Sequence, residues 1–298
     1  MSVTLSPLRV LVPVGDRCGE GATWDAADDC LYWTDINRYL VHRWRPLDET
    51  VRTWMFDEPV VALALTTDPT VMIVATGSRL ILWRSRTDER KPQGFALEGW
   101  PKVRLNDGRP DPGGRFWIGS MRNNVGPEGQ QLAAGGTDGL LFRIDGKGTT
   151  VERRGIGISN TLCWSPDRTK FYFADTLANI IWVHDYDDAA GMIGAPRVFF
   201  EGFDRGWPDG SAMDAEGYLW NCRFGGGCVV RIAPDGSIDR IIDLPVTNVT
   251  TCTFGGPDLK TAFITTASVL SPETERLAGS LFTLESSVPG LPENRFSM

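Results

Sequence analysis

The sequence has few of the residues and motifs on which common enzyme chemistries depend. Only two histidines, His42 and His184, occur in 298 residues, and there is no Gly-x-Ser-x-Gly motif, so a Ser–His–acid triad has little support. The chain has no P-loop and no glycine-rich dinucleotide fingerprint that opens a helix, which disfavours nucleotide chemistry. Its six cysteines show no Cys-x-x-Cys spacing, so we expect reduced thiols and no disulfide framework.

Basic segments and long apolar runs are also missing. The chain has 30 Lys and Arg against 38 Asp and Glu, a net charge of −8, and no stretch dense in Lys and Arg, which argues against a nucleic-acid surface. No apolar run approaches the roughly 18–20 residues that span a bilayer, so no membrane association is expected. The N-terminus lacks the basic start and apolar stretch of a signal peptide, and we expect a cytoplasmic protein.

A tight turn followed by an aromatic strand recurs six times along the chain. Four clear copies begin with Asp or Ser and reach a Trp or Tyr: Asp25–Trp33, Asp111–Trp117, Ser165–Tyr172 and Asp214–Trp220. Weaker copies begin at Thr66 and Gly255, so consecutive copies start 41 to 54 residues apart. A repeat of about this length with several short strands is typical of a β-propeller.

Short apolar and aromatic runs follow each turn, bounded by Gly, Pro, Asp and Asn. In the first repeat they are Leu31–Thr34, Leu40–Trp44 and Val51–Trp54, a pattern that predicts strands joined by tight turns. No segment of twelve or more residues has a clean 3.6-residue apolar period, so helix should be scarce. Leu8–Val12 has no partner nearby in sequence and is expected to complete the last blade. We predict an all-β, six-bladed β-propeller with four-stranded antiparallel blades around a central channel, a single domain over residues 1–298.

One position of the repeat, five residues before the turn, carries a polar residue in four copies: Glu20, Asn106, Asn160 and Asp209. Residues equivalent by repeat become neighbours around an axis when the repeats are arranged radially, so two carboxylates and two amides should converge there. Side-chain oxygens of this kind suit a hard divalent cation. The sequence therefore predicts a metal site at the axis.

The alternative explanation of these residues is local turn formation, because Asn and Asp beside Gly commonly make turns. Glu20, however, is not a turn former. At the same position the second and sixth repeats have Val61 and Thr250, so the fold does not require a polar side chain there. Both observations favour the metal site.

The stretch 123–137 interrupts the third repeat without a strand pattern and is predicted to be a loop. Two roles remain open for it: a solvated surface loop, or a lid over the mouth of the channel.

At these residues the chain resembles the senescence marker protein/gluconolactonase family, the regucalcin-like sugar lactonases. The resemblance covers essentially the full length, and four stretches in matching order carry it: Gly19–Gly21 followed by Trp24, Arg104–Gly119, Ile158–Asn160, and Pro208–Gly210. It implies a six-bladed propeller with one divalent cation at its centre, in which Glu20, Asn160 and Asp209 are the metal ligands. The ion would be Ca²⁺, Mg²⁺, Mn²⁺, Zn²⁺ or Fe²⁺.

The resemblance also implies substrate contacts from Arg104 and Asn106. Some relatives carry a carboxylate just after a Gly-Ser/Thr-Met stretch, where this chain has Arg122, Asn123 and Asn124. Asn124 is thus a third candidate for substrate binding, and this departure leaves open which sugar the site takes.

The expected reaction is the metal-dependent hydrolysis of a sugar-acid lactone, a pentono- or hexonolactone, to the free aldonic acid. We expect Asp209 to accept the proton of the attacking water, with Glu20 as the alternative base. Arg104 would orient the ring or stabilise the oxyanion; otherwise it is a surface arginine paired with Asp107. Asn106 would hydrogen-bond a sugar hydroxyl.

Two other classes of function remain open. One is a calcium-binding regulatory or scaffold propeller without catalysis, since Ca²⁺ prefers oxygen ligands. The other is a related propeller esterase acting on aryl esters or organophosphates. The partner is expected to be a small molecule, and the protein a monomer or a weak homo-oligomer.

Overall fold

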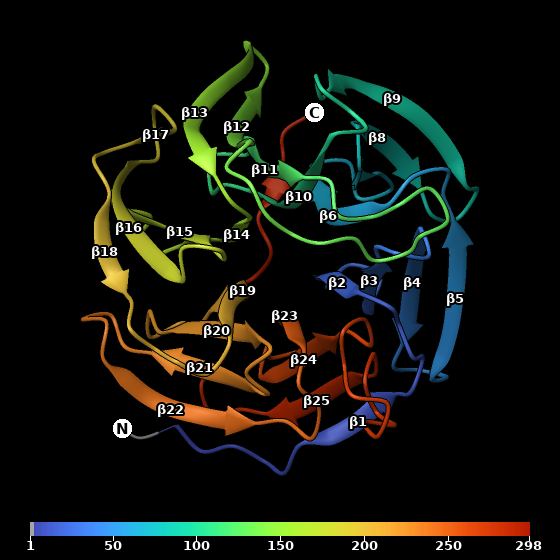
Figure 1. Ribbon diagram of the computed structural model, residues 1–298, viewed down its shortest axis with the longest axis vertical. Coiled ribbons are helices and arrows are strands. Elements are labelled where there is room, and N and C mark those ends of the chain that lie inside the picture. Colours follow the sequence, from blue (N-terminus) through green and yellow to red (C-terminus); the bar gives the residue numbers. More distant parts are fainter. Residues whose placement is uncertain (1–2) are drawn as a thin grey trace.

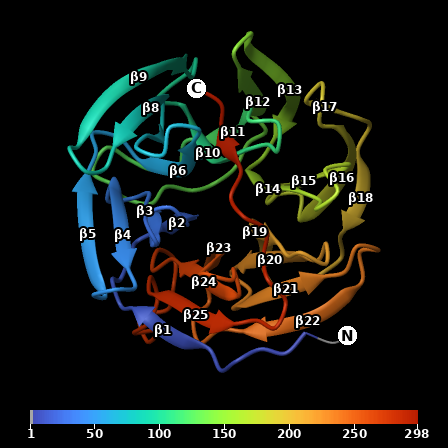
Figure 2. The same cartoon turned by 180° about the vertical axis from the view of Figure 1, so that it is seen from behind.

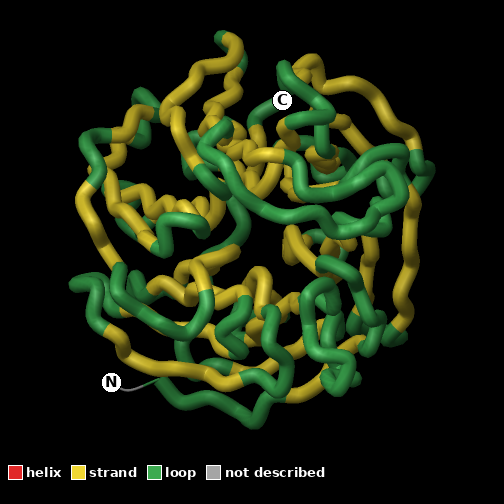
Figure 3. The backbone as a smooth tube through the Cα atoms, in the orientation of Figure 1, coloured by secondary structure: helices red, strands yellow, loops and turns green. Residues whose placement is uncertain are grey.

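A computed structural model describes residues 3–298, so the first two residues of the expected domain lie outside the described part. Six small sheets stand in a ring around a central channel (Figure 1). The described residues contain strands, turns and loops and no helix (Figure 3). No helix that could cross a membrane is therefore found in the described residues. The predicted all-β, six-bladed propeller is confirmed.

The first three blades follow one another along the chain, each running outward from its innermost strand. Blade 1 contains β2 (Gly19–Asp25), β3 (Cys30–Asp35), β4 (Leu40–Arg45) and β5 (Thr50–Met55). Blade 2 contains β6 (Val60–Thr66), β7 (Met72–Thr76), β8 (Arg79–Arg84) and β9 (Glu89–Ala96). Blade 3 contains β10 (Val103–Pro110), β11 (Phe116–Arg122), β12 (Gly139–Asp145) and β13 (Gly148–Ile156).

The remaining three blades complete the ring. Blade 4 contains β14 (Ser159–Trp164), β15 (Lys170–Asp175), β16 (Ile180–Asp187) and β18 (Arg197–Phe200), with the short β17 (Met192–Ile193) also paired to β16. Blade 5 contains β19 (Trp207–Met213), β20 (Leu219–Phe224), β21 (Cys228–Ile232) and β22 (Ile238–Asp243). Blade 6 contains β23 (Val249–Gly255), β24 (Thr261–Thr266), β25 (Leu281–Glu285) and β1 (Arg9–Val12).

The N-terminal strand closes the ring as expected. β1 pairs antiparallel with β25, so the outermost strand of the last blade comes from the beginning of the chain. This pairing ties the beginning of the chain to its last blade and so closes the ring.

The turn aspartates of the repeat anchor buried tryptophans. Trp117 Nε1 donates to Asp111 Oδ2 at 2.9 Å, and Trp220 Nε1 donates to Asp214 Oδ2 at 3.0 Å. Both indoles are fully buried, and a buried indole N–H needs an acceptor. The spacing of six residues between Asp and Trp in these two copies follows from this contact.

Residues 286–298, the tail segment, depart from the predicted four-stranded pattern. Within this segment β26 (Arg295–Phe296) pairs in parallel with the innermost strand β6, so blade 2 has five strands. The prediction of four strands in every blade is therefore wrong for blade 2, and for blade 4 because of β17. The repeat could not predict the tail segment because that segment is not a copy of it.

The tail segment crosses one end of the channel. Leu291 N donates to Met213 O at 3.0 Å, and Asn294 Nδ2 donates to Pro110 O at 3.1 Å. Both acceptors lie at the C-terminal ends of innermost strands, and Figure 2 shows the segment running across the ring from β19 to β11. We call this end of the channel the floor.

Candidate active site

Glu20, Asn106, Asn160 and Asp209 lie on innermost strands at the end of the channel opposite the floor, which we call the mouth. They belong to β2, β10, β14 and β19, in the N-terminal half of each strand. The innermost strands lie next to one another around the ring, because β10 contacts β14, β14 contacts β19, and β2 and β19 both contact β23. All four side chains are buried. The tertiary structure thus brings together residues that are up to 189 positions apart, from Glu20 to Asp209.

A β-bulge follows each of these positions. The pairing register shifts between Glu20 and Thr23 in β2, and between Asn160 and Cys163 in β14. Comparable shifts occur in the other four innermost strands. A bulge bends its strand and changes the direction of a side chain, and bulges are common beside active sites. The six bulges are a property of the fold, whereas a carboxylate or amide side chain occurs in only four of them.

Two glycines next to the carboxylates are required by these bulges. Gly21 has a φ of +59°, in the left-handed region that favours glycine. A Cβ on Gly210 would lie 2.1 Å from Thr251 Oγ1 on the neighbouring innermost strand. The Glu-Gly and Asp-Gly pairs in the sequence therefore reflect the close approach of innermost strands at the mouth.

The two carboxylates at the mouth are crowded and have no basic partner. None of the ion pairs formed among residues 3–298 involves Glu20 or Asp209. Burial, followed by the charge of Asp107, raises the pKa of Glu20 to about 8. Burial, followed by the charges of Glu20 and Asp107, raises the pKa of Asp209 well above its ordinary value. A bound cation would stabilise the ionised form of both groups.

The Asn160 amide is held in one orientation. Its Nδ2 donates to Thr176 Oγ1 at 2.8 Å, and its Oδ1 accepts from Asn106 Nδ2 at 3.2 Å. Thr176 in turn donates to Pro208 O at 2.8 Å, one residue before Asp209. These bonds place the carbonyl oxygen of Asn160, and not its amino group, on the side of the other candidate residues.

The donor set is two carboxylates and one amide oxygen, which fits a hard or borderline divalent cation. No group of three or more His, Cys, Asp and Glu side chains that could hold a metal ion occurs within residues 3–298. A cation at the mouth would therefore depend on the amide of Asn160 and on water for part of its coordination.

Arg104 is buried beside these groups, with 4% of its surface exposed. Its Nε and Nη2 both donate to Asn124 Oδ1, at 3.0 and 2.7 Å. Its Nη1 donates to Leu105 O at 2.8 Å and to Asn106 Oδ1 at 2.7 Å. Burial lowers the pKa of Arg104 to about 10. The alternative of a surface arginine paired with Asp107 is wrong, because Arg104 is buried and bonds neutral oxygens.

Asn106 links Arg104 to Asn160. Its Oδ1 accepts from Arg104, and its Nδ2 donates to Ser159 O at 2.9 Å as well as to Asn160 Oδ1. Both of its N–H groups are thus used within the protein. These bonds hold Arg104 and Asn160 in fixed orientations on either side of Asn106.

Asp107 is a further charged group at the mouth, which the sequence pattern did not single out as a site residue. Burial raises its pKa, and the charge of Arg109 and the N–H groups of Gly108, Leu162 and Thr161 act in the opposite direction. Its Oδ2 is buried without a hydrogen-bond partner in the described chain. The available signal was its place one residue after Asn106, but Asn-Asp-Gly also reads as an ordinary turn.

The insert 123–137 is a loop that reaches from blade 3 to blade 1 on the side of the mouth. Asn37 Nδ2 donates to Gly129 O at 2.9 Å, and Tyr39 OH donates to Gly126 O at 3.1 Å. In Figure 1 the insert, in green, runs across the front of β6. Because Asn124 belongs to it, the insert also supplies the acceptor for Arg104.

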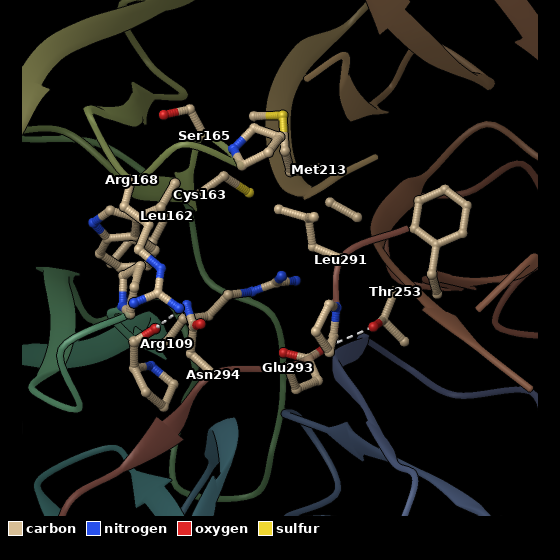
Figure 4. A pocket seen from close by; sticks show the side chains of 17 residues that line it. Arg109, Leu162, Cys163, Ser165, Arg168, Met213, Thr253, Leu291, Glu293 and Asn294 are labelled. Atoms are coloured by element: carbon tan, nitrogen blue, oxygen red, sulfur yellow. Dashed lines mark hydrogen bonds between the residues drawn. The ribbon is translucent and has the colours of Figure 1, made fainter. Parts of the chain in front are cut away.

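The floor has its own small cavity, of about 150 Å³, shown in Figure 4. Arg109 of β10 and Glu293 of the tail segment both line this cavity. Arg109 Nη2 donates to Cys252 O at 3.3 Å, and Glu293 Oε1 accepts from Thr253 Oγ1 at 2.6 Å. Burial lowers the pKa of Arg109, but the carboxylates of Glu293 and Asp107 outweigh this and raise it. None of the predicted site residues lines this cavity.

Comparison with known proteins assigns this chain to one family. The profile of the SMP-30/gluconolactonase/LRE-like region matches residues 18–268. The chain belongs to this family, so the resemblance inferred from its motifs is confirmed.

Three relatives span nearly the whole chain. The pentonolactonase of Haloferax volcanii is 33% identical and the match covers 96% of each chain. The 6-deoxy-6-sulfogluconolactonase of Pseudomonas putida is 32% identical, with 97% of this chain and 98% of the relative covered. The crystal structure of a calcium-binding protein, regucalcin, from Agrobacterium tumefaciens is 29% identical, covers 98% of both chains and has a TM-score of 0.90.

Proposed function

We propose that this protein is a metal-dependent lactonase that hydrolyses a sugar-acid lactone to the aldonic acid. The observation that carries the proposal is the set of two buried, unpaired carboxylates and one oriented amide oxygen beside a buried arginine at the mouth. The names of the Haloferax and Pseudomonas relatives, a pentonolactonase and a sulfogluconolactonase, support lactone hydrolysis.

Glu20, Asn160 and Asp209 are the proposed ligands of one divalent cation, with Ca²⁺, Mg²⁺, Mn²⁺, Zn²⁺ and Fe²⁺ as candidates. Two positive charges would balance Glu20 and Asp209, which have no other counter-charge within ion-pair distance. When bound, such an ion polarises an ester carbonyl and lowers the pKa of a bound water.

The chain's own side chains would carry the proton and hold the substrate. Asp209 accepts a proton from the water that attacks the lactone carbonyl carbon; Glu20 is the alternative base. The ester C–O bond then breaks, and the ring oxygen takes the proton that the base accepted, becoming a hydroxyl and restoring the carboxylate. Arg104, Asn106 and Asn124 contact the substrate, and Asn106 also keeps Arg104 and Asn160 in place. The insert 123–137 covers the substrate.

The test is a panel of pentono- and hexonolactones together with an aryl ester, assayed after chelation and after return of each candidate ion. We expect lactone hydrolysis that disappears with chelator and returns with at least one ion. Hydrolysis that survives complete removal of metal would contradict the metal role, and preference for the aryl ester would favour the propeller-esterase alternative.

A second candidate function has one specific observation in its favour, the description of the Agrobacterium structure as a calcium-binding protein. Binding of Ca²⁺ without hydrolysis of any lactone under any metal would support a binding protein instead of an enzyme. A single domain over residues 1–298, a cytoplasmic location and a monomeric or weakly associating state remain predictions alongside the proposed function.

A further inference from the structure

We infer that the substrate carries an anionic group beside Arg104 and Asn124, so that this site prefers acidic sugar lactones, bearing a carboxylate or sulfonate, to neutral polyhydroxy lactones. The inference rests on the proposed function and names the substrate class of the same site.

The charge of Arg104 has no partner of opposite charge among its hydrogen-bond acceptors. Its hydrogen-bond acceptors are the backbone oxygen of Leu105 and the amide oxygens of Asn106 and Asn124, all of them neutral. Glu20 and Asp209 are the carboxylates whose charges act on Arg104, and a divalent cation would balance both, whereas Asp107 interacts with the charge of Arg109. The charge of a buried guanidinium then has no counter-charge in the loaded site, which is costly unless the ligand supplies one.

Arg104 and Asn124 each have a hydrogen-bond donor left for a ligand. Arg104 has five N–H groups and its hydrogen bonds within residues 3–298 use four, which leaves one on Nη2. Asn124 Oδ1 accepts two bonds from Arg104, so its lone pairs are occupied, whereas its Nδ2 has no partner within residues 3–298. Both residues therefore offer the ligand donors and no acceptor.

A carboxylate or sulfonate group only accepts hydrogen bonds and carries the missing negative charge, so it matches this pair. A hydroxyl can also accept, but its own O–H would find no acceptor on either residue. An acidic residue at position 124 would reverse both properties, because it would neutralise Arg104 and offer oxygen acceptors. Position 124 is thus the specificity-determining residue for the charge of the lactone.

The test uses two lactones that differ in one group, D-glucono-1,4-lactone with a C6 hydroxymethyl and D-glucaro-1,4-lactone with a C6 carboxylate. We expect kcat/KM of the wild-type protein to be about tenfold or more higher for the acidic lactone. Asn124→Asp, which keeps the shape and adds the charge, should lower this preference by about 10- to 100-fold.

The matched control is Asn123→Asp, which adds the same charge one residue earlier. Asn123 Nδ2 donates to Pro101 O and its Oδ1 accepts from Val125 N, and within residues 3–298 its side chain forms no hydrogen bond with Arg104. Its variant should keep the wild-type preference to within about threefold, the change expected of a screened surface charge. An equal loss of preference in both variants would mean that the general negative charge of the mouth acts, and would overturn the role of Asn124.

A second measurement does not require turnover. Calorimetric binding of glucarate and gluconate to the wild-type protein should favour glucarate, and Asn124→Asp should remove the difference. If neither lactone is hydrolysed with any ion, the proposed function fails and this binding comparison decides the inference alone. If the neutral lactone is hydrolysed equally well and Asn124→Asp changes nothing, the inference is wrong and the proposed function stands.

Discussion

The mouth and the floor of the channel are formed by the same six innermost strands, but their buried charges are paired differently. Near the floor, Asp111 accepts from Trp117, from the Tyr186 hydroxyl at 2.6 Å and from Arg115. Asp214 accepts from Trp220 and forms an ion pair with Arg231, of which 1% is exposed. At the mouth, Glu20 and Asp209 have no such partners.

This difference separates stability from function within one repeat. A buried carboxylate with all its donors in place stabilises its blade, whereas one without them destabilises the folded state unless a ligand binds. Sites that bind or catalyse commonly retain such local conflicts. Substitutions at the mouth should therefore change activity, and substitutions near the floor should change the free energy of unfolding.

The largest expected effect is on catalysis at the mouth. Asp209→Asn should lower kcat by about 10²–10⁴-fold, the usual contribution of a general base, and should weaken metal binding. The free energy of unfolding of the metal-free protein should stay equal or rise, because a crowded charge is removed. Steady-state kinetics, metal titration and urea unfolding measure these three quantities. If instead only Glu20→Gln abolished turnover, Glu20 would be the base.

The corresponding change near the floor should affect stability instead. Asp214→Ala removes the carboxylate that pairs with the buried Arg231 and accepts from the Trp220 indole. We expect a loss of about 3–5 kcal/mol in the free energy of unfolding, as for other broken buried ion pairs. The kcat of the folded fraction should be close to that of the wild type. A variant of unchanged stability but lost activity would invalidate the distinction between the two ends.

Arg104→Ala tests the part of the mouth assigned to the substrate. It should lower kcat/KM by about 10- to 100-fold, equivalent to roughly 1.5–3 kcal/mol for a charge-assisted hydrogen bond. Metal affinity should change far less, because a guanidinium is not a metal ligand. Calorimetric titration of the metal provides the comparison, and unchanged turnover would exclude Arg104 from substrate binding.

The last prediction concerns the pH dependence of stability. The pKa of Glu20 is raised from an ordinary 4.5 to about 8, and that of Asp209 is raised as well. A carboxyl group with a higher pKa in the folded than in the unfolded chain binds more protons when folded, so stability falls as the pH rises between these values. We expect the chelated protein to be less stable near pH 8 than near pH 5.

Glu20→Gln and metal loading should both reduce the loss of stability between pH 5 and pH 8, since each removes the cost of ionising Glu20. Urea unfolding over this pH range, with and without metal, measures it. If the stability of the chelated protein rose between pH 5 and pH 8, the raised pKa of Glu20 and Asp209 would be contradicted.

Much of the fold could be predicted because the repeat encodes it locally. The turn aspartates and the tryptophans that follow them, for example, are explained by contacts over six residues. The closure by Leu8–Val12 could be inferred too, because a strand with no local partner must pair with a distant one. The parallel strand β26 was not predictable, since a two-residue strand has no periodicity.

The candidate site was partly predictable for the same reason. Glu20, Asn106, Asn160 and Asp209 share a repeat position, and equivalent positions in a closed ring must lie near one another. The neutral acceptors around Arg104 had no sequence signal, because Asn124 lies in an insert without a strand pattern and meets Arg104 only through the path of that loop. The burial of Asp107 likewise depends on the packing of the innermost strands.

By itself, the sequence determined the six-bladed ring and the position at which polar residues converge, because repeat length and turn chemistry act within each blade. Only the tertiary structure decided which charges at that position are paired. Pairing depends on contacts between the bulge of one blade, the strand of the next and the insert 123–137. That is why Arg104 meets the neutral oxygen of Asn124 and retains a charge for a ligand, whereas Arg231 near the floor has none to offer.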